Sequence, residues 1–142
     1  MILLCLFTTY QKSSTMDHFF KNILHDLKRN STVLACGHNC IEWNGACTDT
    51  GYGRKRVTWP DGQKSIEKTH RLAFMAYNKI LPDKLLKTNE FGQQLDVSHL
   101  CHNKKCINED HLVHEPHVTN MDRNGCFASG YCSKRHKPYC LL

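Results

Sequence analysis

Cysteine and histidine gather in the C-terminal part of the chain at spacings that suit metal binding. One group reads Cys101-x4-Cys106-x4-His111, and the next reads Cys126-x5-Cys132-x3-His136-x3-Cys140. Thiolates and imidazoles are ligands that zinc prefers, and a structural zinc takes four of them. The second group is a complete Cys3His set, so its spacing predicts one structural zinc site.

The first group supplies three ligands and needs a fourth from elsewhere in the chain. The upstream candidates are Cys36, Cys40 and Cys47. The segments around 101–111 and 126–140 contain few apolar side chains, so they bury too little surface to offset the entropy of ordering them. Zinc binding contributes roughly 10–16 kcal/mol of apparent free energy in small finger peptides. We therefore expect two zinc ions to hold these loops.

Two polar residues beside these ligands are not needed by zinc. His99 ends a strand expected over 95–99, and Asn120 lies on a helix expected near the C-terminus. A strand, a zinc loop, a second strand and a helix in succession would bring the end of the first strand against the helix. The sequence therefore predicts an imidazole opposite a carboxamide. Histidine titrates near neutral pH, which suits a general base.

The elements that must position these side chains follow from periodicity and turn signals. In chain order they are a helix over 16–29, strands over 52–59 and 63–66, a buried helix over 67–80, a strand over 94–100 and a helix over 116–124. We expect Thr15 to cap the first helix and Pro82 to stop the second. Pro116 suits the first turn of the last helix, which we expect Gly125 to end.

The strand over 52–59 is basic on one face only. Alternation along a strand places Val57 and Trp59 on one face, where they can pack on the buried helix. The opposite face and the return strand then carry Arg54, Arg56, Thr58 and Lys64, which can face the phosphates or base edges of a nucleic acid. A two-stranded ribbon of this kind can enter the major groove.

Composition narrows the class of protein. The chain has 142 residues, a formal net charge of +6 and nine cysteines. The charge favours a polyanionic partner such as nucleic acid without demanding one. The odd cysteine count argues against a disulfide framework. The apolar run from Met1 to Phe7 is far shorter than a membrane span and makes a poor signal peptide. These features predict an intracellular protein without a membrane partner, nuclear if the source is eukaryotic.

The ordered set of motifs resembles the His-Cys box of nuclear homing endonucleases, within the HNH-like ββα-metal (His-Me finger) nuclease superfamily. The resemblance rests on Ser98-His99-Leu100-Cys101-His102-Asn103, on Cys106, on His111-Leu112, on Asn120 and on the four ligands from Cys126 to Cys140. Upstream, Cys40-Ile41-Glu42-Trp43, Gly51-Tyr52-Gly53-Arg54 and His70-Arg71-Leu72 agree with it. Together these segments cover about residues 36–140.

The resemblance implies a fold and a role for each matching residue. The fold would be α+β, with a ββα-metal core, an antiparallel DNA-binding hairpin and two zinc-stabilised loops. His99 matches the general base, and Asn120 matches the protein ligand of a catalytic Mg²⁺. Cys40 matches the remote fourth ligand of the first zinc. The implied activity is site-specific, homing-type hydrolysis of phosphodiesters in double-stranded DNA. The implied products carry a 5′-phosphate and a 3′-hydroxyl.

The sequence departs from the family pattern in two places. Homing enzymes carry a catalytic arginine just before a tryptophan, but Thr58 precedes Trp59 here, so Arg56 is the expected substitute. The chain ends two residues after Cys140, which makes the family's route to a homodimer doubtful and leaves a monomeric nickase open.

The predicted organisation is a helical extension over 1–35 and a nuclease domain over 36–142. The alternative function is a zinc-stabilised nucleic-acid-binding module without catalysis.

Overall fold

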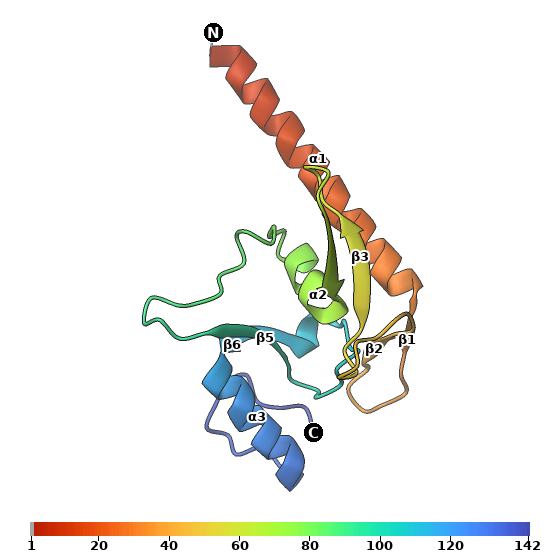
Figure 1. Cartoon of the computed structure of the whole chain (residues 1–142), viewed down its shortest axis with the longest axis vertical. Helices are drawn as coiled ribbons and strands as arrows, with labels where there is room; N and C mark the ends of the chain where they lie inside the picture. The colour runs from red at the N-terminus through yellow and green to blue at the C-terminus, as the bar shows by residue number, and fades with distance from the viewer. Residues whose placement is uncertain (1) are drawn as a thin grey trace.

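A computed structural model describes the backbone of residues 2–142 and the side chains of residues 14–142. The helices in this part of the chain are α1 (Ile2–Arg29), α2 (Thr69–Tyr77) and α3 (His117–Ser129). The strands are β1 (Ser31–Val33), β2 (Ile41–Trp43), β3 (Arg54–Thr58), β4 (Lys64–Lys68), β5 (Leu95–His99) and β6 (Leu112–Pro116), and a 3-10 turn covers Glu109–His111. Figure 1 shows these elements, and the α+β class and ββα arrangement are confirmed.

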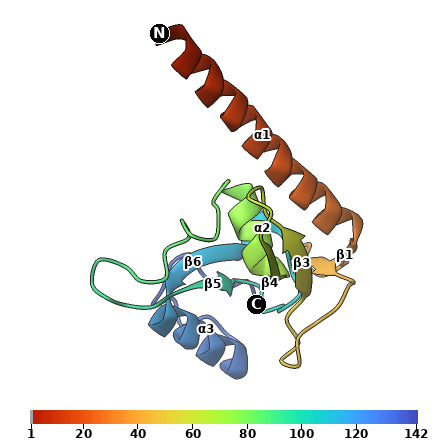
Figure 2. The ribbon, with the colours of Figure 1, turned by 45° about the horizontal axis from the view of Figure 1, so that its top comes forward.

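The strands pair only with their neighbours along the chain. β1 pairs with β2, β3 with β4 and β5 with β6, and each pair is antiparallel. Helix α3 follows β6 directly and contacts both β5 and β6, so β5, β6 and α3 make the ββα unit. In Figures 1 and 2 this unit lies at the end of the molecule away from α1.

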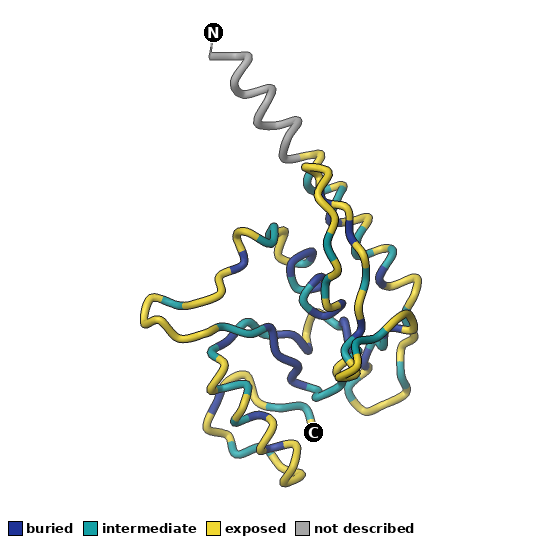
Figure 3. The backbone as a smooth tube through the Cα atoms, viewed as in Figure 1, coloured by how far each residue is buried: buried dark blue, intermediate teal, exposed yellow. Residues whose placement is uncertain are grey.

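The hydrophobic core lies where α1, α2 and the β3–β4 hairpin meet. Buried positions are concentrated along α2 and around the end of β5 (Figure 3). The buried cluster consists of Leu27, Trp43, Val57, Trp59, Leu72, Ala73, Met75, Leu85, Val97, Ile107 and Leu112. Leu27 of α1 and Val57 of β3 are both members, so the N-terminal helix packs on the same core as the rest of the chain.

The two faces of β3 are sorted as the alternation predicts. Val57 and Trp59 are buried, whereas Arg54, Arg56 and Thr58 are exposed. In the antiparallel register Arg54 lies opposite Lys68, and Thr58 lies opposite Lys64. Residues that face each other across an antiparallel pair share a side of the sheet. The hairpin therefore has one continuous exposed side, here called the basic face, made of Arg54, Arg56, Thr58, Lys64, Ile66 and Lys68.

Boundaries of all three helices differ from the predictions. Helix α2 covers Thr69–Tyr77 and not 67–80, so it ends at its C-cap Asn78, before Pro82, and Pro82 does not stop it. Helix α1 begins at Ile2, so Thr15 lies inside it and does not cap it. The segment 2–29 contains neither Gly nor Pro, and nothing in it forces a helix start at position 15. Helix α3 continues through Gly125 to Ser129 and ends at Gly130, which adopts φ 80° and donates its N–H to the Cys126 carbonyl. A left-handed glycine of this kind is the usual helix terminator, whereas a glycine inside a helix costs only about 1 kcal/mol.

Within the described part of the chain, no helix combines the length and apolar character that crossing a bilayer requires.

Candidate metal centres and active site

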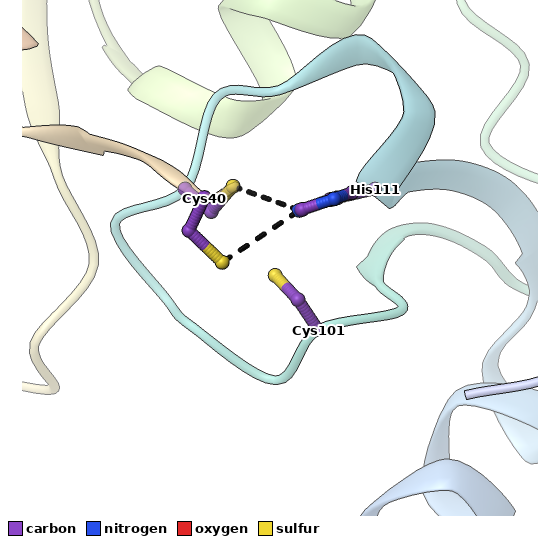
Figure 4. Close-up of side chains that lie close together, drawn as sticks. Cys40, Cys101 and His111 are labelled. Carbon is purple, nitrogen blue, oxygen red and sulfur yellow. Dashed lines mark hydrogen bonds between the residues drawn. The ribbon is translucent and has the colours of Figure 1, made fainter. Parts of the chain in front are cut away.

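The first metal centre joins the segment before β2 to the stretch 101–111. Cys40 precedes β2, Cys101 follows β5, Cys106 lies in the intervening loop and His111 ends the 3-10 turn. Their ligand atoms all lie within 4.8 Å of one another. Figure 4 shows the side chains of Cys40, Cys101 and His111 pointing toward one another. His111 Nδ1 lies 3.7 Å from Cys40 Sγ and 3.4 Å from Cys106 Sγ. Tetrahedral zinc holds neighbouring ligand atoms about 3.5–3.8 Å apart, so the donor set fits zinc.

The fourth position of this centre is filled by Cys40 and not by the other two candidates. Cys36 is exposed, and its Sγ accepts the backbone N–H of Cys40 at 3.4 Å. The thiol of Cys47 instead lies 3.7 Å from the Gly45 carbonyl oxygen. Backbone pairing places Cys40 at this centre. The Ile107 N–H donates to the Ile41 carbonyl, which holds the start of β2 against the loop that carries Cys106.

The three thiols of the first centre cannot all ionise without a cation between them. Burial and the nearby Cys106 thiolate raise the pKa of Cys40 to about 12. The hydrogen bond between Cys101 and Cys106, together with burial, also raises the pKa of Cys101. The same hydrogen bond lowers the pKa of Cys106 to about 5, so Cys106 carries the first negative charge. A divalent cation would compensate all three thiolates and release the remaining protons.

The second metal centre lies between α3 and the C-terminal loop. Cys126 comes from α3, and Cys132, His136 and Cys140 come from the loop, with all ligand atoms within 4.8 Å of one another. His136 Nε2 lies 3.6 Å from Cys132 Sγ and 3.2 Å from Cys140 Sγ. The other ring nitrogen, Nδ1, lies 2.9 Å from Asp122 Oδ2. Because a carboxylate accepts, Nδ1 carries the proton and Nε2 is left as a metal ligand.

Two supports of the second centre were missed in the sequence. Asp122 lies one turn before Cys126 on α3, and that spacing could have identified it. Arg123 is fully buried and makes a two-pronged ion pair with Glu115, at 2.7 Å and 2.9 Å. The guanidinium also donates to the Pro138 carbonyl at 2.7 Å. It thereby joins α3, β6 and the C-terminal loop.

His99 is held in one tautomer at the end of β5. Its Nε2 lies 3.0 Å from the carbonyl oxygen of Cys106, a residue of the first metal centre. A carbonyl oxygen only accepts, so Nε2 carries the proton and Nδ1 keeps a free lone pair. Burial lowers the pKa of His99 to about 4, because a charged imidazole is poorly solvated there. At neutral pH the residue is therefore a neutral imidazole with one basic nitrogen.

Aromatic side chains pack around His99. The ring centroid of His70 lies 4.5 Å from that of His99, and the ring of Tyr52 stacks at 6.4 Å. Burial holds the pKa of His70 well below its usual value, with a further contribution from His99. Both imidazoles are consequently uncharged at neutral pH, which avoids electrostatic repulsion between them.

His99 and Asn120 line the same cavity, as the sequence predicts. The cavity has a volume of about 100 Å³ and is also lined by Tyr52, Val97, Ser98, His102, Lys104, Asn124 and Phe127. A neighbouring cavity of about 310 Å³ is lined by Asn120, Asp96, His117, Lys68 and Arg71, among others. Asn120 therefore lies where the two cavities meet. An imidazole, a carboxamide and three cations around these cavities suit an anionic substrate such as a phosphodiester.

The cations around the cavities are not the expected one. Arg56 is exposed on the basic face and lines neither cavity, whereas Lys68, Arg71 and Lys104 do. Lys68 belongs to both the basic face and the larger cavity, because it ends β4 opposite Arg54. The basic face thus shares Lys68 with the larger cavity, which Asn120 also lines. The family pattern places the arginine next to a tryptophan, here Trp59 just after β3. That local pattern carries no information about cations on β4 and α2.

The buried imidazole predicts a pH-dependent stability. His99 has a pKa of about 4 in the folded chain, against 6.5 for an unperturbed histidine, so the unfolded chain binds this proton first as the pH falls. Stability contributed by His99 is complete above pH 6.5 and is lost between there and pH 4. From pH 7 to pH 5 we expect the free energy of unfolding to fall by about 2 kcal/mol through this residue.

Urea denaturation at pH 5, 6 and 7 measures this effect against a His99→Gln variant. Glutamine keeps an N–H for the Cys106 carbonyl but does not titrate. The zinc ligands titrate in both proteins, so the difference between the two pH slopes isolates His99. Equal slopes would contradict the neutral, buried imidazole.

Comparison with known sequences agrees with this geometry. A search of curated proteins found no match for the chain. A sequence model described as the zinc-binding loop region of homing endonuclease matches residues 39–141. The matched region spans both metal centres, His99 and Asn120. The chain belongs to the homing endonuclease family that carries this zinc-binding loop region, the His-Cys box family.

Proposed function

We propose that the protein is a Mg²⁺-dependent DNA endonuclease in which His99 is the general base and Asn120 holds the metal ion. The observation that carries this proposal is the state of His99: neutral, in a fixed tautomer, and lining one cavity with Asn120. Family membership makes DNA the substrate class. We further propose that two structural zinc ions occupy the two Cys3His centres.

In the proposed reaction, His99 Nδ1 takes a proton from the water that attacks the scissile phosphate. The Cys106 carbonyl stabilises the resulting imidazolium through its hydrogen bond to Nε2. A bound Mg²⁺ would stabilise charge on the phosphate and on the leaving 3′ oxygen. The carboxamide oxygen of Asn120 is a hard donor of the type that Mg²⁺ prefers, and one protein ligand is sufficient when phosphate and water complete the octahedron.

The cations of the two cavities would hold the phosphate backbone. Lys104 lines the cavity that holds His99, and Lys68 and Arg71 line the neighbouring cavity, which Asn120 also lines. This arrangement supports a scissile phosphate between His99 and Asn120, with flanking phosphates on the cations.

We assign Arg56 to DNA binding on the basic face, together with Arg54, Thr58 and Lys64. A basic hairpin of this kind can read base edges in the major groove, which supports a site-specific enzyme.

Replacing Arg54, Arg56 and Lys64 by alanine should weaken DNA binding and reduce its salt dependence. Each lost phosphate contact lowers the slope of log K against log salt by about 0.9. Fluorescence anisotropy with a labelled duplex across a salt series measures both quantities. Lys87 is exposed on the loop before β5, so Lys87→Ala is a matched control with little expected effect. If the triple variant kept the wild-type slope, the basic face would not be the DNA-binding surface.

The ends of the cleaved DNA test the proposed reaction. With His99 as base, the 3′ oxygen leaves and the products carry a 5′-phosphate and a 3′-hydroxyl, so DNA ligase should reseal nicked plasmid. Asn120→Ala should abolish the nicking without loss of either zinc. Wild-type protein that binds DNA but leaves it intact in Mg²⁺ would instead favour the non-catalytic binding module.

A further inference from the structure

Asp96 is the one carboxylate that contacts Asn120 in the described part of the chain. It lies on β5, three residues before His99, with its side chain about one-fifth exposed. Asp96 Oδ2 accepts a hydrogen bond from Asn120 Nδ2 at 2.9 Å and lies 2.6 Å from His117 Nδ1. The second carboxylate oxygen, Oδ1, accepts from Gln94 Nε2 at 3.3 Å.

These contacts determine which end of the Asn120 carboxamide faces the substrate. An ionised carboxylate can only accept hydrogen bonds. The amide nitrogen of Asn120 must therefore face Asp96, since the amide oxygen would repel it. The other end of the carboxamide, its oxygen, is left for the cavity that Asn120 shares with His99. Without a partner of this kind, a carboxamide can turn over and present its nitrogen, which cannot bind a cation.

The carboxylate has hydrogen-bonding partners at both oxygens, with Asn120 and His117 at Oδ2 and Gln94 at Oδ1. Both nitrogen contacts at Oδ2 come from α3, where His117 and Asn120 lie three residues apart on one side of the helix. Asp96 thus also ties the first turn of α3 to β5. With Oδ2 used twice and Oδ1 used once, the carboxylate is an anchor for its neighbours.

We propose that Asp96 is a positioning residue that orients the Asn120 carboxamide for binding the divalent cation. The proposal rests on the proposed function, since it gives Asn120 the metal. Residues that orient a metal ligand typically change metal affinity or activity by about 10–100-fold when they are mutated. We therefore expect Asp96→Asn, which keeps the shape but loses the charge, to raise the Mg²⁺ concentration needed for half-maximal plasmid nicking by about 10–100-fold.

The experiment compares Asp96→Asn, Asp96→Ala and Asn120→Ala with the wild-type protein. Asp83 is an exposed acid away from both cavities, so Asp83→Asn controls for the same change of charge. Zinc content and circular dichroism establish that each variant is folded. The rate of nicking of a supercoiled plasmid is then measured across a Mg²⁺ series, and plasmid binding is measured without Mg²⁺.

A second readout reports the carboxamide directly and needs no activity. In the ¹H–¹⁵N spectrum the Asn120 side-chain pair is identified as the one missing from Asn120→Ala. The proton donated to the carboxylate should lie downfield in the wild type and shift upfield in Asp96→Ala. A direct ligand role for Asp96 would instead raise the Mg²⁺ requirement while the Asn120 resonances stay in place, and that result would overturn the positioning role.

The failures of the two proposals can be told apart. If both Asp96 variants kept the wild-type Mg²⁺ dependence while Asn120→Ala was inactive, Asp96 would have no positioning role and the proposed function would stand. If Asn120→Ala nicked plasmid as fast as the wild type, the metal role of Asn120 and the role of Asp96 would both be wrong. The expected result is a raised Mg²⁺ requirement, unchanged plasmid binding and a shifted Asn120 amide.

Discussion

Replacing Cys106 by serine should unfold the zinc-binding part of the chain and abolish DNA cleavage, and added Mg²⁺ should not restore it. The first metal centre ties the segment before β2 to the 101–111 loop, and its loss removes roughly 10–16 kcal/mol of apparent binding free energy. A whole domain is stable by only about 5–15 kcal/mol. The same change disturbs the backbone carbonyl that holds His99. Zinc analysis and thermal unfolding measured by circular dichroism record the effect.

Two comparisons make this prediction specific to the metal centre. Cys36 and Cys47 lie outside both centres, so Cys36→Ser and Cys47→Ser should keep two zinc ions and the wild-type melting temperature. Cys132→Ser should lose one zinc and release the C-terminal loop while the first centre survives. A Cys106→Ser protein with two zinc ions and unchanged melting would show that this centre is not a zinc site.

Replacing His99 by alanine should lower the cleavage rate by about 10²–10⁴-fold, the usual contribution of a general base, while DNA binding is retained. The reason is the Nδ1 lone pair, which His99 presents to the cavity in a tautomer fixed by the Cys106 carbonyl. His99→Gln should be as slow, because glutamine restores the hydrogen bond to Cys106 but supplies no base. Single-turnover cleavage at saturating protein separates the chemical step from binding.

His25 offers a matched control for the His99 variants. It is an exposed histidine on α1, so His25→Ala should cleave at the wild-type rate. A folded His99→Ala protein that cleaved as fast as the wild type would move the general base elsewhere, with His102 as the next histidine in the same cavity.

Features encoded by short sequence spacing could be predicted, and the metal centres show why. Cys126, Cys132, His136 and Cys140 lie close along the chain, so a short loop brings them together. The faces of β3 follow from alternation, which depends only on strand geometry. Spacing alone left three cysteines as candidates for the fourth ligand of the first centre, and only the family resemblance pointed to Cys40, because the backbone pairing of Ile41 with Ile107 joins segments far apart in the sequence.

Features that depend on long-range packing were missed. The positioning role proposed for Asp96 depends on its contact with Asn120, which lies on α3, 24 residues further along the chain. Arg123 and Glu115 form a buried pair whose partners look like surface residues in the sequence. Local signals at Thr15 and Gly125 did not set the helix ends: no Gly or Pro interrupts residues 2–29, and α3 continues past Gly125 through Cys126, a residue of the second metal centre, to Ser129. The cavity cations Lys68 and Arg71 likewise depend on how β4 and α2 meet the ββα unit.

The most direct test is relaxation of supercoiled plasmid by the two-zinc protein in Mg²⁺, beside a His99→Gln protein of equal zinc content. The wild type should convert the plasmid to nicked or linear DNA in Mg²⁺ and leave it intact in EDTA, and the variant should leave it intact in both. A wild-type protein that holds two zinc ions and binds the plasmid, yet leaves it supercoiled in both Mg²⁺ and Mn²⁺, would contradict an endonuclease built around His99 and Asn120.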